Sequence, residues 1–254
     1  MMGVSYRSFR LWQRNRDVFL RLWHTEAPGM IAEPLFVLLA IGLGLGTYVA
    51  LADNERYIEF IAPGIVAAYA MFSASFECTY GSFFRMKYQR TYEAIITTPL
   101  NIEDVVAGEA FWGATRSLIT ACAILIVIAA FGLVESWWAL AVLPLALLAG
   151  LMFSSIALVF TALAPSVYSF NYYFTLFLTP MFFFSGVFFP LDEFPEIVQN
   201  LSWIVPLTSF ANLSRALVSG DLASGAWWSL GILVGLTAVF FPVSLHLMKR
   251  RLLK

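Results

Sequence analysis

The fold class that this sequence predicts is an all-α polytopic membrane protein with six transmembrane helices. Of its 254 residues, 60% are hydrophobic and 12% are charged, whereas soluble domains carry about 25% charged residues. The mean hydropathy of +0.79 points the same way. Apolar runs take up most of the chain, and six of them approach the roughly 20 residues that a helix needs to cross a bilayer. No remaining segment is long enough for a separate globular domain, so we expect one integral domain over residues 1–254.

The segment before the first apolar run, residues 5–24, is predicted to be an amphipathic interfacial helix. Charged side chains recur there at steps of three and four, which places them on one helical face: Arg7, Arg10, Arg14, Asp17 and Arg21. A separate apolar surface is formed by Phe9, Trp12, Phe19, Leu22 and Trp23. Such a helix lies in the cytoplasmic headgroup layer, in contact with membrane lipids. The arginines alone are equally consistent with a simple topology signal. Because this charged segment precedes the first apolar run, we expect no cleavable signal peptide.

The six apolar runs are expected to span the membrane at residues 31–52, 60–84, 105–133, 138–164, 168–189 and 226–248. If the N-terminus is inside, nearly all flanking cations become cytoplasmic: Arg7, Arg10, Arg14, Arg16, Arg21, Arg85, Lys87, Arg90, Lys249, Arg250, Arg251 and Lys254. Only Arg56 and Arg215 would then lie outside. The positive-inside rule therefore predicts that both termini are cytoplasmic.

The longest polar interruption on the cytoplasmic side runs from Arg85 to Pro99. Residues 86–97 contain no helix breaker, Pro99 would stop a helix, and Asn101 can cap the next one. We therefore expect a short helix beneath the membrane. Its Tyr88, Tyr92 and Ile95 would share a face that could anchor a cytoplasmic partner. The alternative is an ordinary solvated loop.

Three charges lie inside apolar runs, at Glu77, Glu109 and Arg116. Such groups cost several kcal/mol unless they pair or face water. Glu109 and Arg116 are two helical turns apart on one face, and Glu77 lies at a depth that a long arginine can reach. The sequence therefore predicts a Glu77–Arg116–Glu109 cluster that joins the second and third spans. We favour a structural lock for this cluster over a substrate site.

The fifth span is unusually aromatic, with Tyr168, Phe170, Tyr172, Tyr173, Phe174, Phe177, Phe182, Phe183 and Phe184. Aromatic faces could support sliding sugar rings or acyl chains, and packing with an interfacial belt explains them equally well. After this span, two proline-containing pieces bracket an apolar stretch that is too short to cross the bilayer. We expect residues 190–207 to form a re-entrant segment and a candidate outer gate.

Several motifs are absent from the sequence. No GxxxxGK[ST] loop occurs, so the chain cannot bind ATP by that route. The histidines, His24 and His246, form no HExxH or clustered metal site, and GxSxG does not occur. Cys78 and Cys122 lie in apolar runs and are expected to be packing residues. We expect no catalytic residue, no bound metal or cofactor and no nucleic-acid partner.

Five groups of residues together resemble the integral-membrane subunits of bacterial ABC exporters in the polysaccharide and drug export class. They look like those of the nodulation-factor exporter permeases and their relatives, and the resemblance covers nearly the whole chain. It rests on Gln89–Ala94 with Thr98–Leu100, Gly108–Trp112, Ala162–Pro165, Thr179–Pro180 through Ser185–Gly186, and Phe189–Pro190.

This resemblance implies a homodimer of the chain in the bacterial inner membrane, on two copies of an ATPase subunit that hold ATP and Mg. It implies that the ATPase docks at a coupling helix formed by Arg90, Thr91, Tyr92, Glu93, Ile95, Thr97 and Thr98. It also implies a translocation path at the dimer interface, lined mainly by the first, second and fifth spans. Aromatic residues expected at this path and its outer gate are Tyr172, Tyr173, Phe177, Phe184, Phe188 and Phe189.

The function expected from the resemblance is ATP-driven export of an amphipathic molecule, such as a lipid-linked saccharide or a lipo-oligosaccharide. Drug or lipid efflux by the same machinery is the alternative within transport. A proton-coupled secondary transporter is disfavoured, because the spans show no evident inverted repeat or discontinuous midplane helix. A non-transporting membrane anchor would share the spans but would show no ATPase-dependent flux.

Overall fold

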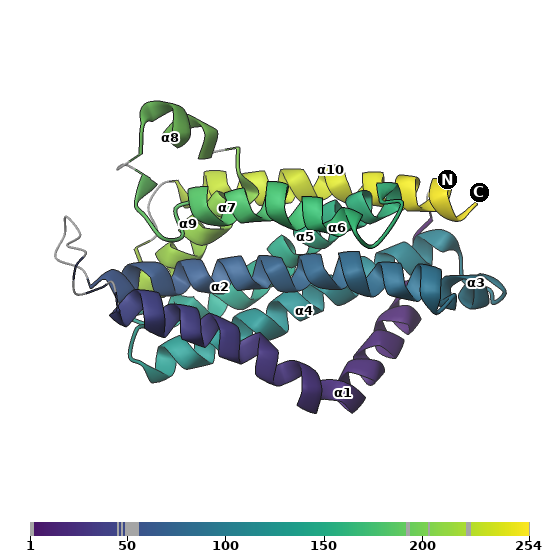
Figure 1. The fold of residues 1–254 in the computed structure, drawn as a ribbon, viewed down its shortest axis with the longest axis horizontal. Coiled ribbons are helices and arrows are strands. Elements are labelled where there is room, and N and C mark those ends of the chain that lie inside the picture. The colour runs from purple at the N-terminus through teal and green to yellow at the C-terminus, as the bar shows by residue number, and fades with distance from the viewer. Residues whose placement is uncertain are drawn as a thin grey trace.

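The computed structural model describes residues 3–44, 46, 48, 56–191, 194–202, 204–221 and 225–253. Within these residues the chain is largely helical and forms no β-strand, which confirms the all-α prediction. The long helices run along one axis, and both termini lie at the same end as α3 (Thr91–Ile96) (Figure 1). We call this the terminal end. The opposite end, where α2 (Tyr57–Phe76) begins and α8 (Glu196–Ser202) lies, is the loop end.

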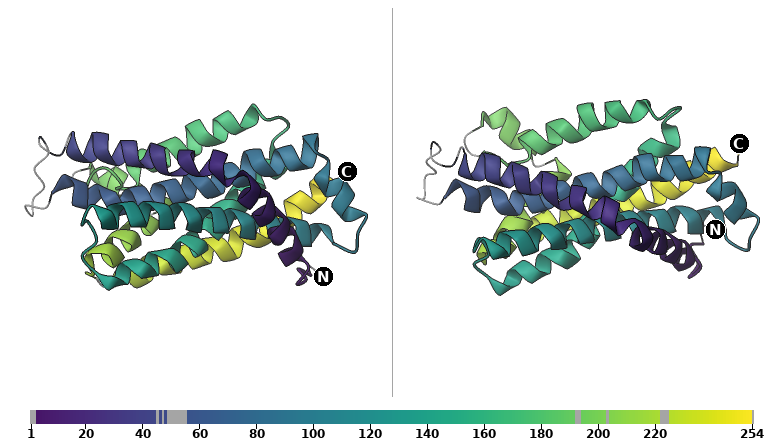
Figure 2. Two further views of the ribbon diagram at one scale, coloured as in Figure 1. Left: turned by 90° about the horizontal axis from the view of Figure 1, so that it is seen from below. Right: turned by 60° about the horizontal axis from the view of Figure 1, so that its bottom comes forward.

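Helix α1 (Ser8–Val37) continues into the π-helical segment η1 (Leu38–Leu43). The predicted interfacial helix and the start of the first span therefore belong to one helical stretch, with a sharp bend between its two arms (Figures 1 and 2). Pro28 lies inside this helix, and proline kinks a helix because it lacks the N–H donor and crowds the preceding turn. Residues 45, 47 and 49–52 of the predicted first span lie outside the described residues.

The first arm of α1 packs on α4 (Ile102–Ala130) through a small, partly polar face that includes Leu11 and Asn15. Gly108 of α4 permits this close approach, because a Cβ there would stand 2.8 Å from the Cβ of Leu11. The predicted aromatic surface is divided. Trp12 donates to Thr115 Oγ1 of α4 at 2.8 Å, and the Phe19 and Trp112 rings lie 5.8 Å apart between centroids, whereas Phe9 and Trp23 are about half exposed. This exposed surface is what an interfacial helix would offer to lipid.

The segments α2, η2 (Glu77–Gly81) and η3 (Phe84–Tyr88) together form one stretch from Tyr57 to Tyr88. It is the most deeply buried of the long segments. Several alanines on α2 are fully buried, and small side chains let neighbouring helices approach closely. The stretch extends beyond residue 84, where the second span was expected to end, and thereby carries Arg85 on a helix.

The helix predicted over residues 86–97 is interrupted, which corrects that expectation. Tyr88 ends η3, Arg90 adopts a left-handed conformation with φ of 50°, and α3 then begins at Thr91. A left-handed residue cannot continue a right-handed helix. The predicted cap of the next helix is confirmed: Asn101 is the N-cap of α4, and its N–H donates to the Asp104 carboxylate at 3.2 Å.

Helix α5 (Val142–Leu163), which follows η4 (Trp137–Ala141), packs against both α4 and α10 (Ala226–Leu252). Glycines allow the α4–α5 contact. A Cβ at Gly113 would stand 2.2 Å from Ser154 Oγ, and one at Gly150 would stand 2.5 Å from Ser117 Cβ. Small residues at such crossings are typical of helix packing in membranes.

Five helical segments within the described residues are long and apolar enough to cross a membrane. The predicted span over 168–189 is not among them. It consists of α6 (Ser169–Tyr172), η5 (Tyr173–Leu178) and α7 (Thr179–Phe184), and the helical path ends before Gly186, which has a positive φ of 79°. Aromatic rings connect this stretch to α2 and η2, for example Phe72 to Phe182 at 5.3 Å between centroids. The six-span count therefore stays a prediction.

At the loop end, α9 (Pro206–Ser219) packs against α2 and α10. This helix begins at the end of the predicted re-entrant segment 190–207, whose residues 192, 193 and 203 lie outside the described residues. Helix α9 is therefore a short helix that packs against the long ones, whereas α8 projects from the loop end (Figure 1). That residues 190–207 form a re-entrant segment stays a prediction.

Candidate functional site

A cavity of about 790 Å³ opens between α1, the α2–η3 stretch, α4 and η5. Ligand pockets commonly measure about 300–1,000 Å³. Its walls combine charged side chains with aromatic rings, and they are formed by Glu26, Gly29, Met30, Glu33, Tyr69, Phe72, Ser73, Phe76, Glu77, Gly81, Arg85, Arg116, Thr120 and Phe174. Because α2 runs from the loop end to the terminal end, the rings of Tyr69 and Phe72 lie nearer the loop end and Arg85 lies nearer the terminal end.

Arg85 joins two carboxylates at this charged part of the cavity. Its Nη2 lies 2.8 Å from Glu77 Oε1 and 2.5 Å from Glu109 Oε2, and its Nε donates to Glu109 Oε1 at 3.0 Å. The Glu109 side chain is fully buried, and it also accepts hydrogen bonds from Ser82 Oγ at 2.9 Å and Asn15 Nδ2 at 3.4 Å. A buried charge of this kind is tolerated only because its oxygens are satisfied.

Arg116 extends the chain of ion pairs toward α1. Its Nη1 lies 2.6 Å from Glu26 Oε2, its Nε lies 3.5 Å from Glu77 Oε2, and its guanidinium lies 4.8 Å from the centre of the Phe19 ring. We call Glu26, Arg116, Glu77, Arg85 and Glu109 the charge network. It connects α1, η2, η3 and α4.

The network corrects the predicted Glu77–Arg116–Glu109 cluster in one respect. Arg116 does approach Glu77, but the partner of Glu109 is Arg85. The sequence predicts Arg85 at the cytoplasmic edge because it begins a polar segment. The helix instead continues past this residue, which turns its side chain back along the helix toward Glu77.

Spacing along the chain could have revealed this pair. Glu77, Gly81 and Arg85 recur at steps of four and therefore share a helical face. Gly81 leaves the room that the ion pair occupies, because a Cβ there would stand 2.9 Å from Glu77 Oε1 and 3.3 Å from Arg85 Nη1. The role of Glu26 carries no such signal, because only the bend in α1 brings it to Arg116.

Residues of the predicted coupling helix fall into two groups. Arg90, Glu93, Thr97 and Thr98 are exposed at the terminal end, while Thr91 and Ile95 are partly buried. Tyr92 is fully buried in the core of its own chain. This overturns the expectation that Tyr92 anchors a partner, and the exposed tyrosine nearby is Tyr88.

The aromatic residues expected along the translocation path also divide. Tyr173 and Phe188 are buried within the chain, where Tyr173 stacks on Phe177 with 5.6 Å between ring centroids. The four others have large exposed fractions: Tyr172, Phe177, Phe184 and Phe189. Of the six expected residues, these four offer an aromatic surface to something outside the chain.

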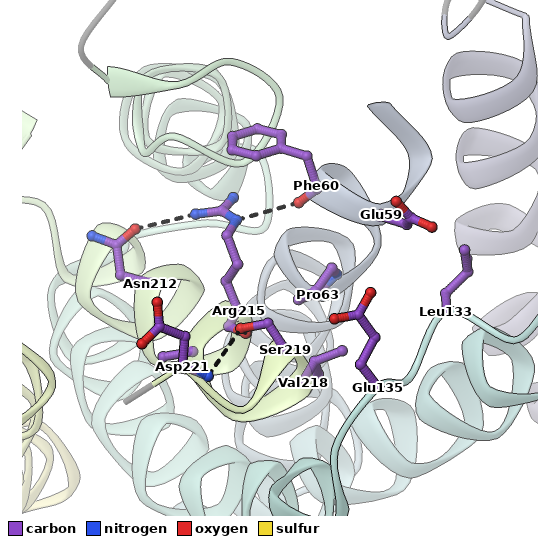
Figure 3. Close-up of a pocket in the computed structure, with 11 residues that line it drawn as sticks. Glu59, Phe60, Pro63, Leu133, Glu135, Asn212, Arg215, Val218, Ser219 and Asp221 are labelled. Atoms are coloured by element: carbon purple, nitrogen blue, oxygen red, sulfur yellow. Dashed lines mark hydrogen bonds between the residues drawn. The ribbon is translucent and has the colours of Figure 1, made fainter. Parts of the chain in front are cut away.

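A second, smaller cavity of about 370 Å³ lies at the loop end beside Arg215 (Figure 3). Arg215 donates to the Gly186 carbonyl at 2.9 Å and the Phe60 carbonyl at 3.3 Å, and its guanidinium stacks 4.0 Å from the centre of the Phe60 ring. It thereby ties α9 to α2 and to the turn after α7. Arg215, which the sequence predicts to lie outside, is partly buried in the structure. Its contacts hold the loop end together.

Comparison with known sequences agrees with this architecture. The sequence profile of the ABC-2 type transporter family matches residues 6–218, which is more than half of the chain. The chain belongs to the ABC-2 type transporter family.

Relatives within this family cover nearly the whole length of the chain. Nodulation protein J of Rhizobium meliloti is 37% identical over 243 residues, which are 96% of this chain and 93% of the relative. Nodulation protein J of Rhizobium leguminosarum bv. trifolii is 37% identical over 252 residues, which are 99% and 96% of the two chains. The inner membrane transport permease YadH of Escherichia coli is 27% identical over 244 residues, 94% of this chain and 93% of the relative. The chain is therefore a multi-pass membrane permease of the ABC-2 type.

Proposed function

We propose that this chain is the membrane-spanning subunit of an ATP-driven exporter, which moves an amphipathic molecule such as a lipid-linked saccharide outward across the inner membrane. The observation that supports this most is the cavity between α1, α2, α4 and η5, with the charge network at one end and aromatic rings at the other. An amphipathic cargo needs a polar environment for its headgroup and an apolar one for its chain. Both are present in one open cavity.

In this proposal the terminal end is cytoplasmic. Arg7 is the N-cap of α1, Arg10 and Arg14 lie in its first arm, and Lys249 and Arg250 lie in the last turns of α10. The positive-inside rule therefore favours this orientation. The same end carries α3 (Figure 1).

An ATPase subunit, present in two copies, would dock on α3 and hold the ATP and Mg that this chain does not bind. The exposed side chains available for that contact are Arg90, Glu93, Thr97 and Thr98. Because the sequence contains no GxxxxGK[ST] loop, the chain itself contributes no hydrolysis. Its part is to convert movement of the docked ATPase into opening and closing of the cavity.

Two copies of the chain would enclose the translocation path between them. Large apolar side chains near the cavity are exposed in the single chain, including Phe36, Phe76, Leu176 and Phe177. A second copy or lipid would cover these side chains, and exposed apolar patches of this kind often mark such contacts. Efflux of a drug or a lipid would use the same parts, and the exposed aromatic residues favour that alternative equally.

Transport into proteoliposomes tests the proposal. The chain is reconstituted together with its co-purified ATPase, and a fluorescently tagged lipid-linked oligosaccharide is added outside. We expect accumulation inside the vesicles with ATP and none with a non-hydrolysable ATP analogue. Uptake that follows an imposed proton gradient and ignores ATP would overturn the proposal.

A further inference from the structure

The cavity contains one carboxylate that the charge network does not include. Glu33 follows Glu26 by seven residues on α1, on the other side of Pro28. It is exposed to the cavity, and its recorded contact is with the Tyr69 hydroxyl at 3.5 Å. Among the described residues, no Lys, Arg or His forms an ion pair with Glu33. The sequence analysis did not identify Glu33 as a charge within an apolar run.

The position of Tyr69 shows how deep this carboxylate lies. Tyr69 is twelve residues from the start of α2 and eight residues before Glu77, or about 18 Å from one and about 12 Å from the other along the helix. Glu33 therefore lies beside a part of α2 that falls within the predicted second span. An ionisable group there is costly unless it faces water, a partner charge or a cargo.

Charge within the cavity is unbalanced. Three carboxylates, those of Glu26, Glu33 and Glu77, line it together with the two guanidinium groups of Arg85 and Arg116, which gives a formal charge of −1. Both arginines are already engaged with Glu26, Glu77 and the buried Glu109. Glu33 is thus the carboxylate of the cavity wall that lies outside these ion pairs.

Aromatic rings line the same cavity as this carboxylate. Tyr69, Phe72, Phe76 and Phe174 all line the same cavity, and the rings of Tyr69 and Phe72 lie 6.1 Å apart between centroids. A carboxylate beside several aromatic faces is the combination that binds organic cations, because the ring faces carry negative potential.

We infer that Glu33, with these four rings, is a binding site for a protonated amine in the polar head of the cargo. This inference rests on the proposed function and narrows its substrate class to amphipathic molecules that carry an ammonium group. Glu33 supplies the counter-charge and accepts a hydrogen bond from the ammonium, Tyr69 orients the carboxylate, and the rings cover the rest of the cation.

Binding of a matched pair of probes to the complex in lipid nanodiscs tests this inference. Monodansylcadaverine is a fluorescent amphipathic amine, and its N-acetyl derivative is neutral but otherwise closely similar. We expect the wild type to bind the amine more tightly than the acetylated probe. Since a hydrogen bond to a charged group is worth about 1.5–3 kcal/mol, we expect Glu33→Gln to weaken amine binding about tenfold or more. Glu33→Asp keeps the charge and should retain most of the affinity.

The control carboxylate is Glu196, which is exposed on α8 at the loop end, and Glu196→Gln should leave both probes unaffected. Equal binding of the two probes by the wild type would overturn the inference, as would a Glu33→Gln variant with unchanged amine binding. Dissociation of the Glu33→Gln dimer into monomers would also overturn the inference, because the cation that pairs with Glu33 would then belong to the second copy of the chain and not to a cargo. Because these readouts need neither ATP nor flux, they can fail while ATP-driven uptake of the oligosaccharide persists.

Discussion

Removing the cation between Glu77 and Glu109 is expected to destabilise the protein strongly. The Glu109 side chain is fully buried, and Arg85 makes two direct contacts with it at 2.5 and 3.0 Å. Arg85→Gln would leave this buried carboxylate with Ser82 and Asn15 alone. Breaking one side of a buried pair costs about 3–5 kcal/mol, and for a chain of this size about 1 kcal/mol corresponds to roughly 2–4 °C in Tm. We therefore expect Arg85→Gln to lower the Tm by about 10 °C.

In a Cys122→Ser background, the buried thiol of Cys78 provides the assay, because a thiol-reactive fluorophore reaches it only when the protein unfolds. The matched control is Arg56→Gln, which removes an ion pair with Glu59 whose arginine is 69% exposed. An exposed pair is worth about 0–1 kcal/mol, so this control should barely move the Tm. Equal Tm shifts in the two variants would refute the reasoning. Adding Glu109→Gln to Arg85→Gln should restore part of the loss, because it removes the stranded charge.

Three further predictions follow from the same contacts. Arg116→Ala and Glu26→Gln should be non-additive by about 0.5–3 kcal/mol in a thermal-unfolding cycle, and strict additivity would contradict their pairing. Gly113→Leu should destabilise the chain by about 1–3 kcal/mol, because a side chain there collides with α5; an unchanged Tm would mean that the crossing is looser than described. Glu93→Ala should reduce ATPase recovery in a pull-down at unchanged Tm. Tyr92→Ala should instead lower the free energy of unfolding by about 3–5 kcal/mol and lower the Tm with it. The opposite pattern would return Tyr92 to the docking surface.

The sequence predicts much of this fold because hydropathy and capping are local properties. Apolar runs of sufficient length locate five long helices, and Asn101 marks the start of α4 three residues before Asp104. These signals depend on neighbours in the chain and on the bilayer. They do not depend on how the helices pack.

Features that depend on packing were missed or misplaced. Arg90 turns left-handed and breaks a helix that its neighbours would allow, which buries Tyr92 and exposes Tyr88. The polar segment that begins at Arg85 does not reveal its ion pairs, because these depend on the helix that carries its side chain back toward two carboxylates. Glu26 and Glu33 join the cavity only because α1 bends, and no local pattern shows the direction of a bent arm.

The central claim is that an ATPase subunit drives this permease, and composition of the intact complex tests it most directly. The tagged chain is extracted gently from its native membrane, and the co-purifying subunits are identified and counted by native mass spectrometry. The account predicts two copies of this chain with two copies of a subunit that carries a GxxxxGK[ST] loop. Reproducible recovery of the chain without any such subunit, under conditions that preserve a known transporter complex, would contradict it.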